Sequence, residues 1–304
     1  MGVVKMMKDI GGYLDEETRI SLTRELSEKG YCIIKDVLTP RQVNMAKEMF
    51  YDWKGTIPEH DKMHSKVDPH GIYKHHQVGH QRHAWYIRTR PKVQAMYKYL
   101  WNRSSLISSF DGCCYIDKMC KKRDNCWTHT DQGSRYEGVC YQGFVSLTDN
   151  KERTLVVYEG SHLYHREYFK EKGLDTSKNW NLIDTDTLKS MESSKRVLEV
   201  PAGSLVIWDS RCFHQNQYGK ECSEERLVQY VCYFPSDHKD NTKKMVEKRV
   251  KYFNELRTTS HWPCRIKVNG DQPRTYGDNN LKIDYSTLRA PYLDDMMMEI
   301  HKLL

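Results

Sequence analysis

Apolar residues recur at helical spacing near both ends of the chain and at strand spacing in its middle. Residues 15–29 predict a helix that ends before Gly30, a residue typical of helix C-termini. The β-prone run 31–37 follows. A second helix is expected after Thr39, which can cap it in a capping box with Gln42. The chain therefore opens with the order helix, strand, helix.

The second helix continues as a stripe of apolar residues, which is expected to face a core. Its members are Val43, Ala46, Met49, Phe50 and Trp53. Residues 54–84 are polar and rich in histidine, and this stretch is interpreted as a loop outside the core. Residues 92–102 again have helical spacing. Residues 1–104 are thus expected to form an N-terminal cap of helices around one strand.

From about residue 105 to 235 the pattern changes to short β-prone runs separated by turn-forming residues. The expected strands are 112–117, 128–131, 141–148, 154–158, 196–200, 204–209 and 226–234. Many short strands at this spacing are typical of a sandwich or jelly roll. Residues 236–304 return to helix, at 241–257 and near 291–303. The whole chain, 1–304, is therefore expected to be one α+β domain with a mainly β core.

The composition is that of a folded protein in a reducing compartment. Twenty Tyr, seven Trp and seven Phe supply bulky core material. No apolar run reaches the length of a membrane span, and the N-terminus lacks a secretory signal. The ten cysteines are expected to be free thiols in the cytoplasm. The net charge of +7 is interpreted as a mildly basic surface; nucleic acid is the alternative partner, although no binding motif for it occurs.

The stretch Trp127-Thr128-His129-Thr130-Asp131 carries the most informative chemistry. Residues two apart on a strand face the same side, so His129 and Asp131 can offer an imidazole and a carboxylate to one metal ion. A further histidine would complete the set of two histidines and one carboxylate that binds non-haem Fe(II) and leaves positions open for substrates. An HxD pair alone is weak evidence, because 14 His and 41 acidic residues produce such pairs by chance.

The third ligand is expected to be His214, which follows the predicted strand 204–209. His162 and His165 are the alternatives, and His214 is favoured because Arg226 opens the strand that comes next.

Strand alternation places Arg226 on the same face as Val228 and Tyr230. A guanidinium among apolar and aromatic neighbours needs an anionic partner. The distal carboxylate of 2-oxoglutarate would satisfy it in bidentate geometry.

These motifs together resemble the phytanoyl-CoA dioxygenase-like family of Fe(II)- and 2-oxoglutarate-dependent oxygenases. The chain is especially similar to uncharacterised members, some of them encoded by large DNA viruses. The segments that carry the resemblance are Gly30–Leu38, His129–Gln132, Gly160–His162 with Glu159 in place of the family's proline, Pro201–Ser204 followed by Trp208 and His214, and Arg226. The resemblance implies a double-stranded β-helix, which is a distorted jelly roll, with N- and C-terminal helices packed outside it.

The resemblance also implies the reaction. Fe(II) at His129, Asp131 and His214 would act with 2-oxoglutarate and O2, and ascorbate would serve as a stimulating reductant. Decarboxylation to succinate and CO2 would accompany hydroxylation of a C–H bond in a small molecule that the family does not identify. Two alternatives stay open: a non-catalytic jelly-roll binding protein, which the four intact residues disfavour, and an oxygenase directed at nucleic acid.

Further residues are candidates for the cosubstrate and substrate pockets. Tyr115, in the strand before the HxD motif, and Asn216, two residues after His214, could bind 2-oxoglutarate. Gln132 and Gln142 could line the pocket. For each, the alternative is a structural role in a strand or loop.

The segment that contains His80, Trp85 and Arg88 could close over the site as a substrate lid, because it mixes aromatic and basic side chains. The alternative is that these three residues belong to a packed N-terminal cap.

Overall fold

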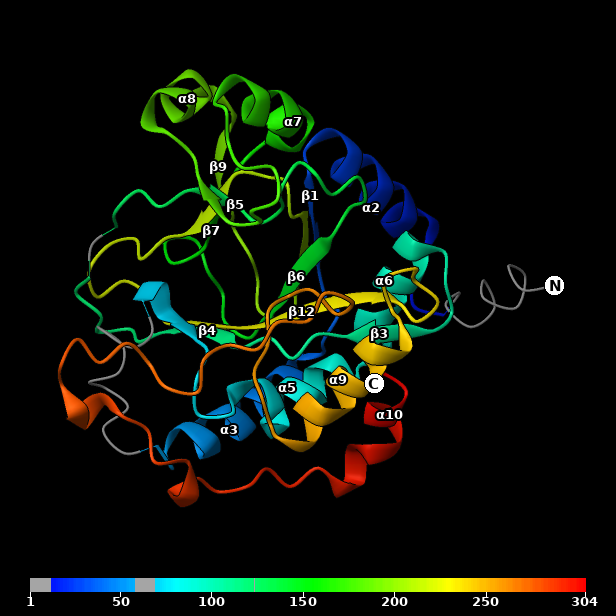
Figure 1. Ribbon diagram of the computed structural model, residues 1–304, viewed down its shortest axis with the longest axis vertical. Coiled ribbons are helices and arrows are strands. Elements are labelled where there is room, and N and C mark those ends of the chain that lie inside the picture. The colour runs from blue at the N-terminus through cyan, green and yellow to red at the C-terminus, as the bar shows by residue number, and fades with distance from the viewer. Residues whose placement is uncertain (1–11, 58–68, 123) are drawn as a thin grey trace.

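Two antiparallel β-sheets form the centre of the computed structural model, which describes residues 12–57, 69–122 and 124–304 (Figure 1). The larger sheet contains, in pairing order, β1 (Tyr31–Ile34), β10 (Leu205–Asp209), β6 (Tyr141–Ser146), β12 (Arg226–Pro235), β4 (Cys113–Ile116) and β2 (Ile72–Tyr73), with β3 (Leu106–Ser108) also paired to β12. The smaller sheet contains β8 (Asn181–Leu182), β5 (His129–Thr130), β11 (His214–Asn216), β7 (Leu155–Tyr158) and β9 (Lys195–Val197). The chain crosses repeatedly between the sheets, as in a jelly roll, and the predicted fold class is confirmed.

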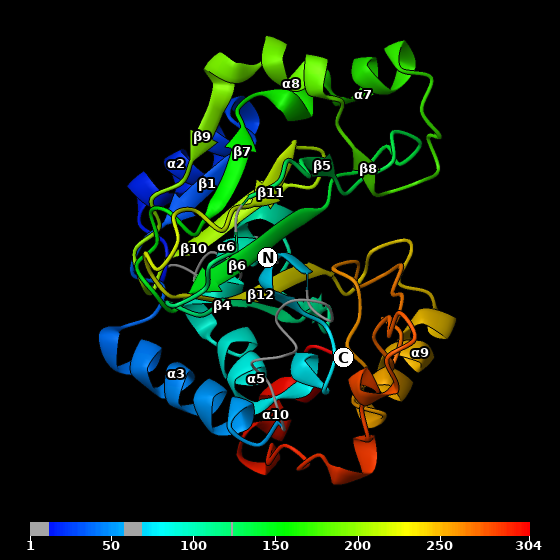
Figure 2. The same cartoon turned by 90° about the vertical axis from the view of Figure 1, so that its left-hand side faces the viewer.

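Helices cover the outer face of the larger sheet. Figure 2 shows α3 (Pro40–Lys54), α5 (Arg82–Arg88) and α10 (Met297–His301) on the side of this sheet that faces away from the smaller one. The other α-helices in the described ranges are α2 (Glu16–Glu28), α6 (Pro91–Trp101), α7 (Ser161–Glu171), α8 (Thr185–Ser190) and α9 (Lys243–Asn254). In Figure 1, α7 and α8 lie at the opposite end of the molecule from α3 and α5, beyond β9 and β7. No helix in the described ranges is long and apolar enough to cross a membrane.

Local sequence signals explain where the first helices begin. The Asp15 side chain accepts a hydrogen bond from the Thr18 backbone at 2.8 Å and so caps α2. Thr39 and Gln42 form the predicted capping box at the start of α3. The expected strands correspond to β4, β5, β6, β7, β9, β10 and β12. Strand β11 was not predicted, because His214-Gln215-Asn216 is polar throughout.

Alternation along β12 separates two hydrophobic cores. Leu227 and Val231 belong to the core beneath the helices. Val228 belongs to the core between the two sheets, and Tyr230 packs against it. Arg226 also points inward, since its guanidinium lies 5.3 Å from the ring centroid of Phe144 in that inner core. The predicted common face of Arg226, Val228 and Tyr230 thus agrees with the structure.

The interpretation of residues 54–84 as a loop outside the core was wrong for its final part. Residues 58–68 lie outside the described residues. The 3-10 helix Val78–His80 is buried, as is the helix α5 that follows it apart from its first residue, Arg82, and His83 and Trp85 expose no surface. Neutral imidazoles pack as aromatic rings, so a histidine-rich sequence can enter a core that its polarity alone does not predict.

His83 makes this burial testable. Its ring centroid lies 5.2 Å from that of Phe50, and neither ring nitrogen has a hydrogen-bond partner in the described part of the chain. Burial lowers the pKa of His83 to about 3, whereas an unfolded histidine titrates near pH 6.5. The folded state therefore binds fewer protons, and its stability falls as the pH decreases from about 6.5 towards 3.

We expect His83→Phe to raise the free energy of unfolding by about 1 kcal/mol at neutral pH, because no buried polar group is left unpaired. The gain should grow as the pH falls to 5. Urea denaturation at the two pH values measures both effects, with exposed His301→Phe as the control. A variant that is less stable than the parent at pH 5 would contradict this account of His83.

Candidate active site

The three predicted metal ligands converge between β5 and β11. His129 and His214 are register partners across these strands, and Asp131 follows β5. Asp131 Oδ2 lies 3.6 Å from His129 Nε2 and 3.3 Å from His214 Nε2. The three ligand atoms all lie within 4.8 Å of one another. One divalent ion could therefore be bound by two imidazoles and a carboxylate.

Backbone carbonyls fix the tautomer of both imidazoles. His129 Nδ1 lies 3.1 Å from the carbonyl oxygen of Trp127, and His214 Nδ1 lies 2.9 Å from that of Cys212. A carbonyl oxygen only accepts, so each Nδ1 carries the proton and donates. Each Nε2 therefore presents a lone pair to the shared space, as a metal-binding histidine requires.

Asp131 is held as an oriented carboxylate. Its burial opposes ionisation, but positive charge on the neighbouring imidazoles of His129 and His214, when they are protonated, outweighs this effect and holds the pKa of the carboxyl well below its usual range. Gln142 Nε2 donates to Asp131 Oδ2 at 3.0 Å. Gln142 thus has the orienting role that outer residues have at metal sites.

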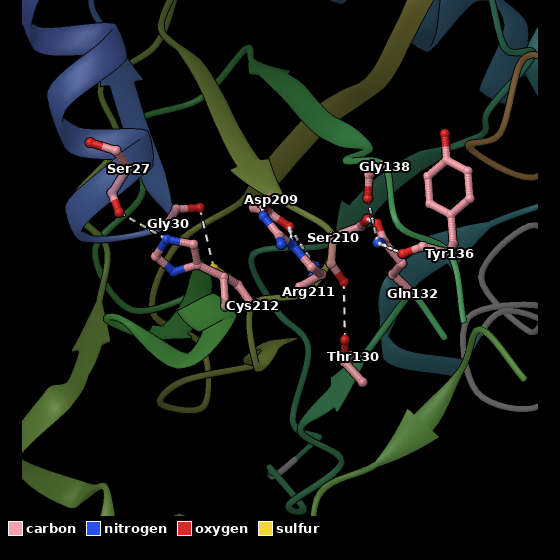
Figure 3. A network of polar contacts seen from close by, with 11 residues as sticks. Ser27, Gly30, Thr130, Gln132, Tyr136, Gly138, Asp209, Ser210, Arg211 and Cys212 are labelled. Atoms are coloured by element: carbon pink, nitrogen blue, oxygen red, sulfur yellow. Dashed lines mark hydrogen bonds and ion pairs between the residues drawn. The ribbon is translucent and has the colours of Figure 1, made fainter. Parts of the chain in front are cut away.

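Polar contacts also fix the turn that leads to His214 (Figure 3). The backbone N–H of Asp131 and the hydroxyl of Thr130 both donate to the carbonyl of Ser210, at 3.0 and 3.1 Å. Ser210 Oγ donates to Gln132 Oε1 at 2.8 Å, and Gln132 Nε2 donates to the Gly138 carbonyl at 2.8 Å. Gln132 was predicted to line the pocket. Its side chain is instead buried in this brace and does not reach the cavity.

The contact from Gln142 predicts a loss of metal affinity. We expect Gln142→Leu to weaken binding of Mn(II) or Fe(II) by about tenfold, the usual effect of removing one such outer contact. Anaerobic calorimetric titration measures the affinity. Gln42→Leu, at the cap of α3, is the control, and it should lower fold stability without changing metal affinity. Equal affinity in Gln142→Leu and the parent would contradict the orienting role.

The ligands open into a cavity of about 260 Å³ between the sheets. Of the residues predicted for the pocket, Gln142 and Asn216 line it. Trp208 and Tyr230 also line it, although neither was a candidate from sequence. The signal for Tyr230 was present, because the alternation of its strand already placed it on the face of Arg226.

Arg226 lies directly behind Asn216. Its Nη2 donates to Asn216 Oδ1 at 2.9 Å and its Nη1 donates to the Arg153 carbonyl at 3.1 Å, while Nε is buried without a partner. Within the described ranges, no carboxylate makes an ion pair with this fully buried cation. An unpaired buried guanidinium fits an anionic ligand, and Tyr230 Oη, 2.8 Å from Asn216 Nδ2, provides a hydroxyl beside it.

Tyr115 lies on the other side of the sheet, so the prediction that it binds the cosubstrate was wrong. It pairs with Leu227, whose side chain belongs to the core beneath the helices, and its hydroxyl donates to Asp117 Oδ2 at 3.1 Å. The inward residue is its neighbour Cys114, whose Sγ lies 3.8 Å from Asn216 Nδ2. The prediction failed by one position, and one position reverses the face of a strand.

The prediction of a lid from His80, Trp85 and Arg88 was also wrong. All three are buried without exposed surface, and none lines the cavity. Arg88 donates to the carbonyls of Gly79 and Asp111, so it ties the N-terminal cap to the start of β4. A side chain held in this way cannot open and close over a site.

Sequence reasoning missed the contribution of the C-terminal region. Thr259, Ser260, His261 and Asn269 line the same cavity as the metal ligands. Burial lowers the pKa of His261, although nearby Asp131 acts against this shift. No sequence motif marks these residues, because the side chains around them in sequence do not follow a recognisable pattern of ligand or catalytic residues.

A sequence profile of the family phytanoyl-CoA dioxygenase (PhyH) matches residues 26–217, which is more than half of the chain. The chain is also 26% identical over 267 residues to "Ava biosynthesis cluster protein O" of Aspergillus versicolor, and the alignment covers 79% of this chain and 85% of that protein.

Solved structures share the fold. HygX from Streptomyces hygroscopicus, with nickel and 2-oxoglutarate bound, has a TM-score of 0.51 at 14% identity over 74% of this chain and 88% of its own. The non-haem α-ketoglutarate-dependent carbocyclase SnoK from nogalamycin biosynthesis has a TM-score of 0.51 at 17% identity over 74% of this chain and 86% of its own. GIG2 from Candida albicans has a TM-score of 0.58 at 12% identity over 83% of this chain and 75% of its own.

The jelly roll and its His-Asp-His cluster define a non-haem iron, 2-oxoglutarate-dependent oxygenase. The chain belongs to the phytanoyl-CoA dioxygenase (PhyH) family.

Proposed function

We propose that His129, Asp131 and His214 hold the Fe(II) of this oxygenase, and that Arg226 binds the distal carboxylate of 2-oxoglutarate. The observation that carries the proposal is the convergence of two Nε2 atoms and one carboxylate oxygen within 4.8 Å, with both Nδ1 atoms engaged by backbone carbonyls. Asn216 and Tyr230 are proposed to assist Arg226, since they join it to the cavity.

Each residue has a defined part in the proposed reaction. When bound, Fe(II) couples the decarboxylation of 2-oxoglutarate to succinate and CO2 with the oxidation of a substrate C–H bond by O2. Gln142 keeps Asp131 oriented, and the buried Arg226 places the cosubstrate by its charge. Leu155 and Trp208 line the cavity with apolar surface, which limits the access of water to the reacting groups.

The substrate is proposed to be a small molecule that enters the cavity of about 260 Å³. The chain is proposed to act as one domain, because residues from the C-terminal region complete the cavity wall. The ten cysteines are all free thiols, which is consistent with the proposed location in the reducing cytoplasm.

A succinate assay tests the proposed function. Purified protein is supplied with Fe(II), ascorbate, 2-oxoglutarate and air, with and without a pool of small metabolites. We expect succinate that depends on both iron and 2-oxoglutarate, and a higher rate with a pool that contains the substrate. The absence of succinate under every condition, together with no stabilisation of the fold by 2-oxoglutarate, would refute the proposal.

A further inference from the structure

Two polar atoms of C-terminal residues that line the cavity have no hydrogen-bond partner among the described residues. Ser260 Oγ and His261 Nε2 are both buried, and neither has a hydrogen-bond partner in the described part of the chain. Both residues line the cavity that contains His129, Asp131 and His214. An unpaired buried polar atom costs about 1–3 kcal/mol. Two such atoms beside a metal site therefore indicate a ligand that pairs with them.

The segment that presents these atoms is fixed in place. The backbone N–H of Thr259 donates to the Phe110 carbonyl at 3.0 Å, and the Phe110 N–H donates to Thr259 Oγ1 at 3.0 Å. The Ser260 N–H donates to the Lys267 carbonyl at 2.8 Å. Trp262, the residue after His261, is 3% exposed and packs in the core. The unpaired atoms thus belong to a rigid, preorganised surface.

The chemistry of the two side chains restricts the group that they can bind. Ser260 Oγ can donate and accept, and His261 Nε2 donates or accepts according to the tautomer of the ring. A hydroxyl pairs with both atoms in either tautomer, because it donates to one of them and accepts from the other. An ether or carbonyl oxygen only accepts, so it leaves Nε2 unpaired whenever Nε2 is the acceptor.

The remaining unpaired atoms of the site have a different origin. Arg226 Nε and Trp208 Nε1 are also buried without partners, but they come from the strands of the larger sheet. The proposed function assigns Arg226 to the cosubstrate. Ser260 and His261 lie outside residues 26–217, the part of the chain that matches the family. The pair thus belongs to a part of the cavity wall that the family profile does not describe.

We propose, on the basis of the proposed function, that Ser260 and His261 form the substrate-recognition site and bind a hydroxyl group of the molecule that is oxidised. The substrate class is thus a small alcohol, held by its hydroxyl so that a neighbouring C–H bond faces the space between His129, Asp131 and His214.

Matched alcohols and ethers test this proposal. Protein loaded with Mn(II) and 2-oxoglutarate is mixed with cyclohexanol or benzyl alcohol, or with the methyl ether of each, and paramagnetic broadening of the probe's proton NMR lines is measured. We expect at least one alcohol to bind about fivefold more tightly than its ether. Ser260→Ala and His261→Phe should remove this preference, and His261→Gln, which retains an acceptor, should keep part of it.

The outcomes separate the two proposals. Binding of Mn(II) and 2-oxoglutarate is measured in the same samples by the magnetic resonance of the ion and by calorimetry. Failure of either to bind the parent protein counts against the proposed function. If both bind, the proposed recognition site is overturned by either of two results. The first is that the NMR lines of neither alcohol broaden more than those of its ether. The second is that Ser260→Ala keeps the parent's preference for the alcohol over the ether. Ser260→Ala is informative on its own, because its hydroxyl makes no hydrogen bond within the described chain and its loss should not unfold the protein.

Discussion

His214→Ala is expected to lower the rate of 2-oxoglutarate decarboxylation by more than about 100-fold. Changes to outer contacts of metal sites already cost up to about 100-fold, and His214 supplies one of only three proposed ligands. Among the described residues, the only other imidazole of the cluster is that of His129, which is itself a proposed ligand. Succinate formation at saturating Fe(II) measures the effect.

His301→Ala is the matched control for this variant, because His301 is exposed on α10. It should retain the parent's rate. A His214→Ala protein that decarboxylates 2-oxoglutarate within about threefold of the parent would remove His214 from the proposed ligand set, since loss of a true ligand costs far more.

Arg226→Met is expected to abolish the stabilisation of the fold by 2-oxoglutarate. At a concentration 100 times its dissociation constant, a ligand that binds only the folded state adds about 2.7 kcal/mol to the free energy of unfolding. The variant should gain almost none of this, because Arg226 is the proposed partner of the distal carboxylate of the cosubstrate. Without ligand, the stability should change little, since the lost hydrogen bonds are offset by removal of an unpaired buried charge.

Urea denaturation with Mn(II), in the presence and absence of 2-oxoglutarate, measures both quantities. Arg249→Met is the control, because Arg249 is equally buried but donates to the carbonyls of Leu304 and Pro263, away from the cavity. It should destabilise the fold and keep the response to 2-oxoglutarate. If Arg226→Met keeps the full response, the cosubstrate carboxylate binds elsewhere.

The convergence of His129, Asp131 and His214 could be predicted because its signals are local or depend only on strand order. His129 and Asp131 are two apart at the end of β5, and Arg226 opens a strand that follows His214. Tyr115 could not be placed, because its face depends on the register of β4 against β12. A shift of one residue in that register would have turned it inward.

The rest of the cavity depends on contacts between segments that are distant in sequence. Ser260 and His261 line the same cavity as His129, Asp131 and His214 because Thr259 pairs with Phe110 before the start of β4. Arg88 donates to the carbonyls of Gly79 and Asp111, which belong to two segments that are distant in sequence, and these contacts hold its side chain in the core. No periodicity encodes either arrangement, so the substrate side of the site becomes visible only in the folded structure.

His129, Asp131 and His214 are proposed to bind one Fe(II) that also binds 2-oxoglutarate. Anaerobic titration of Fe(II) into the protein with 2-oxoglutarate, followed by visible absorption, tests it most directly. We expect a charge-transfer band that saturates at one iron per chain, requires 2-oxoglutarate and is absent in His214→Ala. A folded parent protein that develops no such band, or a His214→Ala protein that develops the same band, would refute this iron site.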